Sequence, residues 1–154
     1  MLNWKLFGAI TITMLPGAAI ALSCLPPDIQ DSFHSAEASE KSYIVVEGEF
    51  TLEDPEFVAE PGKRMLTSGS FKGRWLGSRG KSSRFEHPVT FEVECVEDIC
   101  GKILPGENLI TFLRKEKDEY FVEVQPCGGS LFYGPSKSDK EAVQQCLNGG
   151  DCRS

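Results

Sequence analysis

The chain has 154 residues, of which 25% are charged and 40% are hydrophobic, with a formal net charge of −7 and six cysteines. This length is enough for one domain with its own core and excludes two comfortable domains. There are only two histidines, in unrelated segments, and no CxxC, P-loop, nucleophile-elbow or dinucleotide motif, so the composition argues against an enzyme and against a metal or cofactor of the protein's own.

Residues 1–23 have the pattern of an export signal. Met1 and Lys5 form a weak positive start, and the apolar run that follows is too short to span a bilayer. Ala21 and Ser23 place small side chains where signal peptidase needs them for a cut before Cys24. We therefore expect a mature chain of residues 24–154 that folds as one domain, has no transmembrane helix and is secreted or periplasmic.

The stretch from Ala21 to Cys24 also passes loosely as a lipoprotein box, in which Cys24 would carry a lipid anchor and the domain would be an envelope scaffold. The parity of the cysteines favours simple cleavage, because lipidation would leave one thiol unpaired in an oxidising compartment. Three disulfides would use all six cysteines in one of 15 pairings. The six are Cys24, Cys95, Cys100, Cys127, Cys146 and Cys152.

The first half of the mature chain begins with a short helix. Apolar residues at spacings of four and three predict this helix over Asp28 to Ala38, after the Pro26-Pro27 pair. Strict alternation then predicts a half-buried strand over Ser42 to Leu52. An acidic loop and a weaker alternating strand, Met65 to Leu76, follow.

The segment from Gly77 to Ser83 has little apolar surface, and we expect a mobile loop there. Val89 to Val96 alternates clearly, which predicts a strand with Phe91, Val93 and Cys95 facing inward. Glu92 and Glu94 fall on the outward phase, where we expect them to serve only solubility.

Two strands and a helix complete the pattern. Asn108 to Lys115 and Glu119 to Val124 flank a charged turn, as in a β-hairpin, and Ser138 to Leu147 has helical spacing. About five strands without alternating helices favour a mainly β fold, a small closed or partly closed antiparallel barrel with short flanking helices.

Charge is distributed unevenly. Residues 24–60 contain ten acidic residues against Lys41 alone, whereas residues 61–84 contain seven basic residues and no acidic one. One interpretation is a solvated face that pairs with the acidic segment. The other is an anion-binding strip for acidic polysaccharide, since export disfavours nucleic acid as a partner. The residues of this basic strip are Lys72, Arg74, Arg79, Lys81 and Arg84.

The order of cysteines and strands resembles a known family. Its residues are Cys24-Leu25-Pro26-Pro27, then Cys100-Gly101, then PGENLITFLRKEKDEYFVEVQPC ending at Cys127, and a tail helix near Cys146. Together they resemble the netrin-like (NTR) module, and within it most closely the inhibitory domain of the tissue inhibitors of metalloproteinases (TIMP), in a simpler form found in secreted bacterial proteins. The resemblance implies an oligonucleotide/oligosaccharide-binding (OB) type barrel stapled by disulfides.

The resemblance also implies a partner and a site. In that family the free amine and carbonyl of the first cysteine chelate the catalytic zinc of a metalloprotease. Cys24 would take this role here, with Leu25 entering the apolar pocket beside the zinc. It further implies a Cys24–Cys100 disulfide. Because Pro26 stands where the family has a second cysteine, Cys127 would pair with Cys146, which leaves Cys95 with Cys152.

These observations lead to one expectation and its alternative. We expect an exported OB-type binding module that inhibits a zinc metalloprotease through Cys24, Leu25 and Pro26. The alternative is a module without inhibitory activity that binds acidic glycan or an envelope polymer through the basic strip.

Overall fold

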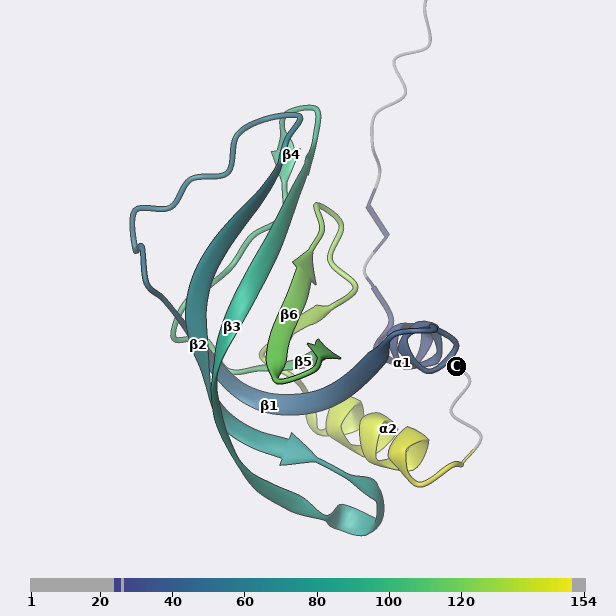
Figure 1. Cartoon of the computed structure of the whole chain (residues 1–154). Helices are drawn as coiled ribbons and strands as arrows, with labels where there is room; N and C mark the ends of the chain where they lie inside the picture. Colours follow the sequence, from purple (N-terminus) through teal and green to yellow (C-terminus); the bar gives the residue numbers. More distant parts are fainter. Residues whose placement is uncertain (1–23, 26, 151–154) are drawn as a thin grey trace, which may run out of the picture.

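The computed structural model describes residues 24–25 and 27–150, so the expected export signal lies outside the described residues (Figure 1). The elements, in chain order, are α1 (Ile29–Glu37), β1 (Ser42–Leu52), β2 (Arg64–Leu76), a short 3-10 turn η1 (Ser78–Gly80), β3 (Ser82–Val96), β4 (Ile99–Cys100), β5 (Leu109–Glu116), β6 (Glu119–Val124), β7 (Leu131–Tyr133) and α2 (Lys137–Leu147).

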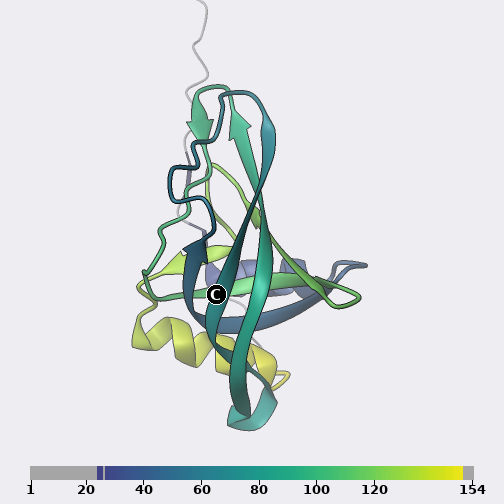
Figure 2. The same cartoon turned by 60° about the vertical axis from the view of Figure 1, so that its left-hand side comes forward.

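Five strands close into a barrel in the order β1, β2, β3, β6, β5, and β5 pairs back with β1 (Figures 1 and 2). This arrangement confirms the predicted fold class, a mainly β barrel with two short helices and disulfides. One pairing differs from the expected antiparallel pattern, because β3 and β6 run parallel. The difference arises where the second strand of the β5–β6 hairpin returns to close the barrel against β3.

The barrel core is built by the alternation seen in the sequence. Phe50 lies at its centre, with its ring 5.1 Å from the ring of Phe71 and 4.8 Å from that of Phe91, both edge to face. Such aromatic contacts stabilise a core beyond simple burial. The other buried residues of this core are Val46, Phe85, Val89, Val93, Leu109, Leu113, Val122 and Val124.

Two glycines allow β1 and β2 to approach closely. Gly48 and Gly73 are directly opposite each other in the antiparallel register. A Cβ atom on Gly73 would lie 2.1 Å from the carbonyl oxygen of Glu47, and one on Gly48 would lie 2.2 Å from that of Lys72. A side chain at either position would clash with the backbone of the other strand, so the glycine pair lets β1 and β2 lie close together here.

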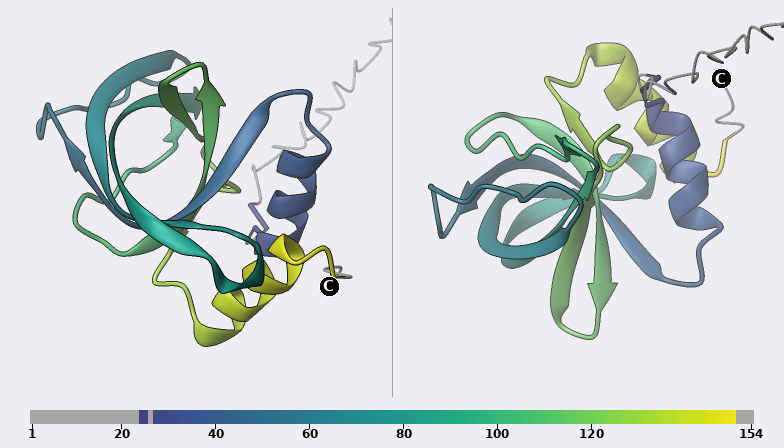
Figure 3. Two further views of the ribbon diagram at one scale, coloured as in Figure 1. Left: turned by 60° about the horizontal axis from the view of Figure 1, so that its bottom comes forward. Right: turned by 90° about the horizontal axis from the view of Figure 1, so that it is seen from above.

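The two helices cover the outer face of β5 and the start of β1 (Figure 3). Asp28 caps α1 by accepting from the backbone N–H groups of Gln30 and Asp31, and Ser136 begins α2 with a capping box. The helices and these strands share a second buried cluster, which consists of Ile29, Val45, Ile110, Phe112 and Val143.

The β2–β3 hairpin is longer than the sequence predicts. β3 begins at Ser82, and the segment expected to be a mobile loop forms the ordered turn η1. Gln144 Nε2 donates to the Gly77 carbonyl at 3.2 Å, and the Arg79 backbone N–H donates to Asn148 Oδ1 at 2.6 Å. The contacts that order this segment come from α2, nearly seventy residues away in sequence, so local composition does not reveal them.

An ion-pair network lies outside the barrel where β3, β5 and β6 meet. The side chain of Arg114 is only 7% exposed and donates to Glu92 through two nitrogens at 2.9 Å, to Glu123 at 2.9 Å and to Glu116 at 2.7 Å. Arg64 donates to Glu92 at 2.8 Å. The hydrogen bonds from Arg114 lower the pKa of Glu92, although burial opposes this. Glu92 is therefore a buried partner of this network, and the expectation of a purely solubilising role was wrong.

Candidate protein-binding site

The N-terminal segment is fixed against the loop that joins β6 to β7. Cys24 forms a disulfide with Cys127, and their Cα atoms are 5.1 Å apart. Gly128 follows with a φ of +78°, and a Cβ atom there would approach the Pro27 ring to 3.1 Å. Pro26 lies outside the described residues. Cys24 is thus tied covalently to this loop, and Pro27 lies close to Gly128 in it.

Leu25 lies in this N-terminal segment, and its side chain is not part of either core. It is 83% exposed, more than any other large hydrophobic residue that the structure describes. A single exposed leucine on a soluble surface is unremarkable. Leu25 is a different case, because the Cys24–Cys127 disulfide restrains the backbone next to it. Less backbone entropy is therefore lost when a partner binds this residue.

The β3–β4 turn provides a second apolar element at the same end of the barrel (Figure 1). Cys95 and Cys100 are directly opposite each other in the β3–β4 register and form a disulfide across it. Val96 and Ile99 between them are 49% and 43% exposed.

A hollow of about 420 Å³ connects the two elements, since Pro27 and Ile99 both line it, together with Val124, Leu131 and Tyr133. The Tyr133 hydroxyl accepts a hydrogen bond from the Leu104 backbone at 2.9 Å, and burial raises the pKa of Tyr133. Two disulfide-held segments therefore flank a mainly apolar depression.

The expected disulfide pairing was wrong. The family resemblance implied Cys24–Cys100 and Cys127–Cys146, whereas the structure pairs Cys24 with Cys127 and Cys95 with Cys100. Strand register explains the second pair, because β4 places Cys100 opposite Cys95 with their Cα atoms 4.0 Å apart. Cys146, on α2, is also disulfide-bonded. Cys152 lies outside the described residues. Its expected bond to Cys95 is nevertheless excluded, because Cys95 is bonded to Cys100.

Acidic residues pair with two residues of the basic strip. Arg74 donates to Glu47 at 3.0 and 2.5 Å, and Arg84 donates to Glu86 at 2.5 Å. Lys72 lies opposite Glu49 on β1 and opposite Glu86 on β3 in the strand register. Of the two ion pairs, the one between Arg74 and Glu47 joins the basic segment to the acidic segment of residues 24–60, whereas Glu86 lies beyond that segment.

Three residues of the strip, Lys72, Arg79 and Lys81, form no ion pair within the described part of the chain. Arg79 and Lys81 lie together at the exposed end of the β2–β3 hairpin, whereas Lys72 lies within β2. A smaller cationic spot therefore remains at this turn. Binding of acidic polysaccharide there stays a prediction.

Glu47 connects the barrel to α2. Burial raises its pKa, but hydrogen bonds from Lys140 of α2 and Arg74 of β2 outweigh burial and lower it. Lys140 Nζ lies 2.7 Å from Glu47 Oε1. This carboxylate is therefore a structural contact between α2, β1 and β2.

The structure also shows where the histidines lie. The ring of His87 packs at a tilt against the rings of Phe85 and Tyr120, with centroids 4.6 and 5.1 Å away, and His34 lies on α1. Across residues 24–25 and 27–150 there is no cluster of three side chains suited to hold a metal ion. Over the same residues, no helix has both the length and the apolar character needed to cross a membrane.

Comparisons with protein-family models, with curated proteins and with solved structures find no match to this chain. The site is therefore interpreted from its own geometry. The sequence singled out Cys24 and Leu25, and the structure brings them beside Cys127. The sequence analysis did not identify Ile99 or the hollow that Ile99 and Pro27 line. The short Cys95 to Cys100 spacing was the signal that could have indicated a tight, exposed turn.

Proposed function

We propose that this protein is an exported, netrin-like binding module that inhibits a zinc metalloprotease through its N-terminal edge, Cys24, Leu25 and Pro26. The observation that carries the proposal is the 83% exposure of Leu25 directly after a disulfide-anchored cysteine. The disulfides favour an oxidising compartment, as expected for an exported protein. The Cys24–Cys127 bond also uses the sulfur that a lipid anchor needs, which supports simple cleavage before Cys24.

The chemistry of inhibition depends on the α-amine of Cys24. Signal-peptidase cleavage before this residue frees an amine whose ordinary pKa is about 7.7 to 8.0, so its neutral form is accessible near neutral pH. A catalytic zinc keeps an open coordination position, which such an amine can fill. Burial of Leu25 in the neighbouring apolar pocket then contributes about 1.5 to 3 kcal/mol.

The hollow lined by Pro27 supports a broader contact. Ile99, in the turn closed by the Cys95–Cys100 disulfide, lines the same hollow. A partner that covers Leu25 would also cover Ile99 and remove additional apolar surface from water. Both elements are fixed by covalent bonds, so little ordering is required on association.

The first experiment is the intact mass and N-terminal peptide of the exported protein, followed by inhibition assays against a panel of zinc metalloproteases. We expect a start at Cys24 with an unmodified amine. Leu25→Ala should weaken inhibition about 10- to 100-fold, and addition of one alanine before Cys24 should abolish it. Leu66→Ala is the matched control, because Leu66 is also exposed, at 65%, but lies on β2. Inhibition that survives the extension would exclude chelation by the amine.

A second candidate function is supported by Arg79 and Lys81, two cations without an ion pair that lie together at the β2–β3 turn. In this proposal the hairpin turn binds acidic polysaccharide, and affinity falls steeply with salt because exposed charges are screened within about 8 to 10 Å. Retention on a heparin-like resin should be lost in the double variant Arg79→Ala/Lys81→Ala and kept in Lys72→Ala. Equal retention of both variants would count against a site at the turn.

A further inference from the structure

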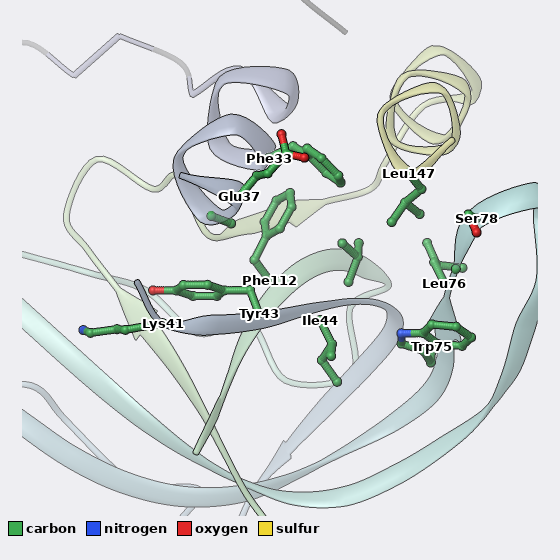
Figure 4. A pocket seen from close by; sticks show the side chains of 13 residues that line it. Phe33, Glu37, Lys41, Tyr43, Ile44, Trp75, Leu76, Ser78, Phe112 and Leu147 are labelled. Atoms are coloured by element: carbon green, nitrogen blue, oxygen red, sulfur yellow. The ribbon is translucent and has the colours of Figure 1, made fainter. Parts of the chain in front are cut away.

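A trough lies beneath α1, away from the N-terminal edge (Figure 4). Its volume is about 430 Å³, which falls in the range of pockets that hold small molecules. Side chains from both helices and from three strands line it, and most of them are apolar or aromatic. The main ones are Phe33, Tyr43, Trp75, Leu76, Phe112 and Leu147.

The strand pairing explains why this space is open. β1 pairs with β2 only from Val45 onward, while Ser42 to Ile44 pair with β5 alone. No strand of the barrel covers the free side of this short segment. The β2–β3 hairpin bends towards α2 instead, where Gln144 holds Gly77. The trough is therefore bounded by both helices and by β1, β2 and β5.

A second, polar hollow of about 260 Å³ lies next to the trough. Ala36, Tyr43 and Phe112 line both spaces, so the two share a wall. In Figure 4 the Tyr43 hydroxyl points away from Trp75, on the side of Lys41. The polar hollow is lined by hydroxyl and amide groups from α1 and from the loop after β6, namely Ser32, Ser35, Ser39, Gln125 and Ser130.

Several of these polar groups are available to a ligand. Within the described residues, the Tyr43 hydroxyl, the Gln125 amide and the Ser130 hydroxyl make no hydrogen bond to the protein. Each is a neutral donor and acceptor. Gln125 and Ser130 line the polar hollow, and Tyr43 lies in the wall between this hollow and the apolar trough.

The charged groups nearby are largely satisfied by each other. Lys41 Nζ lies 3.6 Å from Glu123 Oε1, and Glu123 also accepts from Arg114 at 2.9 Å. Glu37 lies on the rim, where its carboxylate is 70% exposed and 3.8 Å from the His34 ring. No unpaired cation of the described chain lines the trough to hold an anionic head group, and Glu37 repels one.

We propose that this trough binds an uncharged amphipathic small molecule. Its hydrocarbon or ring body lies between Trp75 and Phe112, and its hydroxylated head lies against Tyr43, Gln125 and Ser130. The proposal goes beyond the inhibitory function and does not depend on it, because neither Cys24 nor Leu25 lines the trough.

The probe is octyl glucoside below its micelle-forming concentration, titrated into the exported protein. Trp75 is the only tryptophan in residues 24–154, so its fluorescence reports on the trough directly, and calorimetry gives the dissociation constant. We expect saturable binding with a change in Trp75 emission. Glucose, which has the head alone, and octanoate, which has a charged head, should each bind at least ten-fold more weakly.

Two variants of α1 test the location. Ala36→Leu fills the wall shared by the two spaces and should weaken binding at least ten-fold. Ala38→Leu makes the same change at an exposed position of the same helix end and should leave binding unchanged. Thermal unfolding of both variants shows whether each is folded.

Tyr43→Phe tests the head group, and loss of one neutral hydrogen bond should weaken octyl glucoside binding about three- to ten-fold. Chemical-shift changes at the Trp75 indole N–H of the unmodified protein give a measurement that does not depend on any variant. The proposal is overturned if the probe does not bind, if octanoate binds as tightly, or if the folded Ala36→Leu variant binds like Ala38→Leu.

Discussion

Replacement of Arg114 by methionine tests the ion-pair network on the barrel wall. Arg114 is almost fully buried and contacts three carboxylates, of which Glu92 is itself only 12% exposed. Methionine preserves much of the apolar stem and removes the charge and its hydrogen bonds. Glu92 then keeps only Arg64, whose side chain is 53% exposed.

The expected loss is about 3 kcal/mol in the free energy of unfolding at pH 7. Removal of one partner from a buried ion pair costs about 3 to 5 kcal/mol, because the remaining charge is left buried without compensation. The contact with Arg64 places Arg114→Met at the lower end of this range. With an m-value of about 2 kcal/mol/M, the urea midpoint should fall by about 1.5 M.

The pH dependence of this loss gives a sharper test. In the native protein the pKa of Glu92 is lowered, so the stability it contributes is complete above its ordinary value near 4.5 and is lost as the pH falls below that. In the variant, burial without Arg114 raises this pKa, and protonation relieves the penalty. The difference in the free energy of unfolding between the native protein and the variant should therefore become smaller as the pH falls from 7 to 4.

Urea unfolding followed by Trp75 fluorescence measures both effects. Arg84→Met is the control, since Arg84 and Glu86 form an exposed pair, and its midpoint should stay close to that of the native protein. A loss below 1 kcal/mol in Arg114→Met at pH 7 would refute the reasoning, as would an equal loss at pH 4 and pH 7.

Two further predictions concern the disulfides and the close approach of β1 and β2 at Gly48 and Gly73. Replacement of both cysteines of the Cys24–Cys127 pair by serine should cost about 4.7 kcal/mol in urea unfolding, against about 2.2 kcal/mol for the Cys95–Cys100 pair, because their sequence separations are 103 and 5. Equal losses would show that loop closure is not the main contribution. Gly73→Ala should destabilise the barrel by about 1 to 3 kcal/mol in the same assay, because its Cβ atom would lie 2.1 Å from the carbonyl oxygen of Glu47 on β1. An unchanged stability would mean that β1 and β2 can move apart at this position without cost.

The strand faces could be predicted because alternation is a local property. The inward residues of β1 and β3, such as Phe50 and Phe91, follow directly from a period of two. Both helices were also found from spacing, and their observed ends lie within one residue of the predicted ones. In β5, residues on both faces are buried, under the helices and inside the barrel, which blurs the alternation.

Features that depend on distant partners could not be predicted in this way. The parallel pairing of β3 with β6, the order in the β2–β3 hairpin and the Cys24–Cys127 disulfide each join segments whose sequences carry no local trace of the contact. The candidate site shows the same division. Leu25 was found because it follows a cysteine, whereas the trough depends on where β1 stops pairing with β2.

The loop between β6 and β7 lines two different surface hollows. Gln125 and Ser130 line both the hollow shared by Pro27 and Ile99 and the polar hollow next to the trough, and Cys127 between them forms the disulfide with Cys24. Thermodynamic linkage then relates the two surfaces. A small molecule that changes the preferred conformation of this loop also changes the affinity for a protein partner, and the partner changes the affinity for the small molecule by the same factor. A titration of either ligand in the presence of the other measures that coupling free energy.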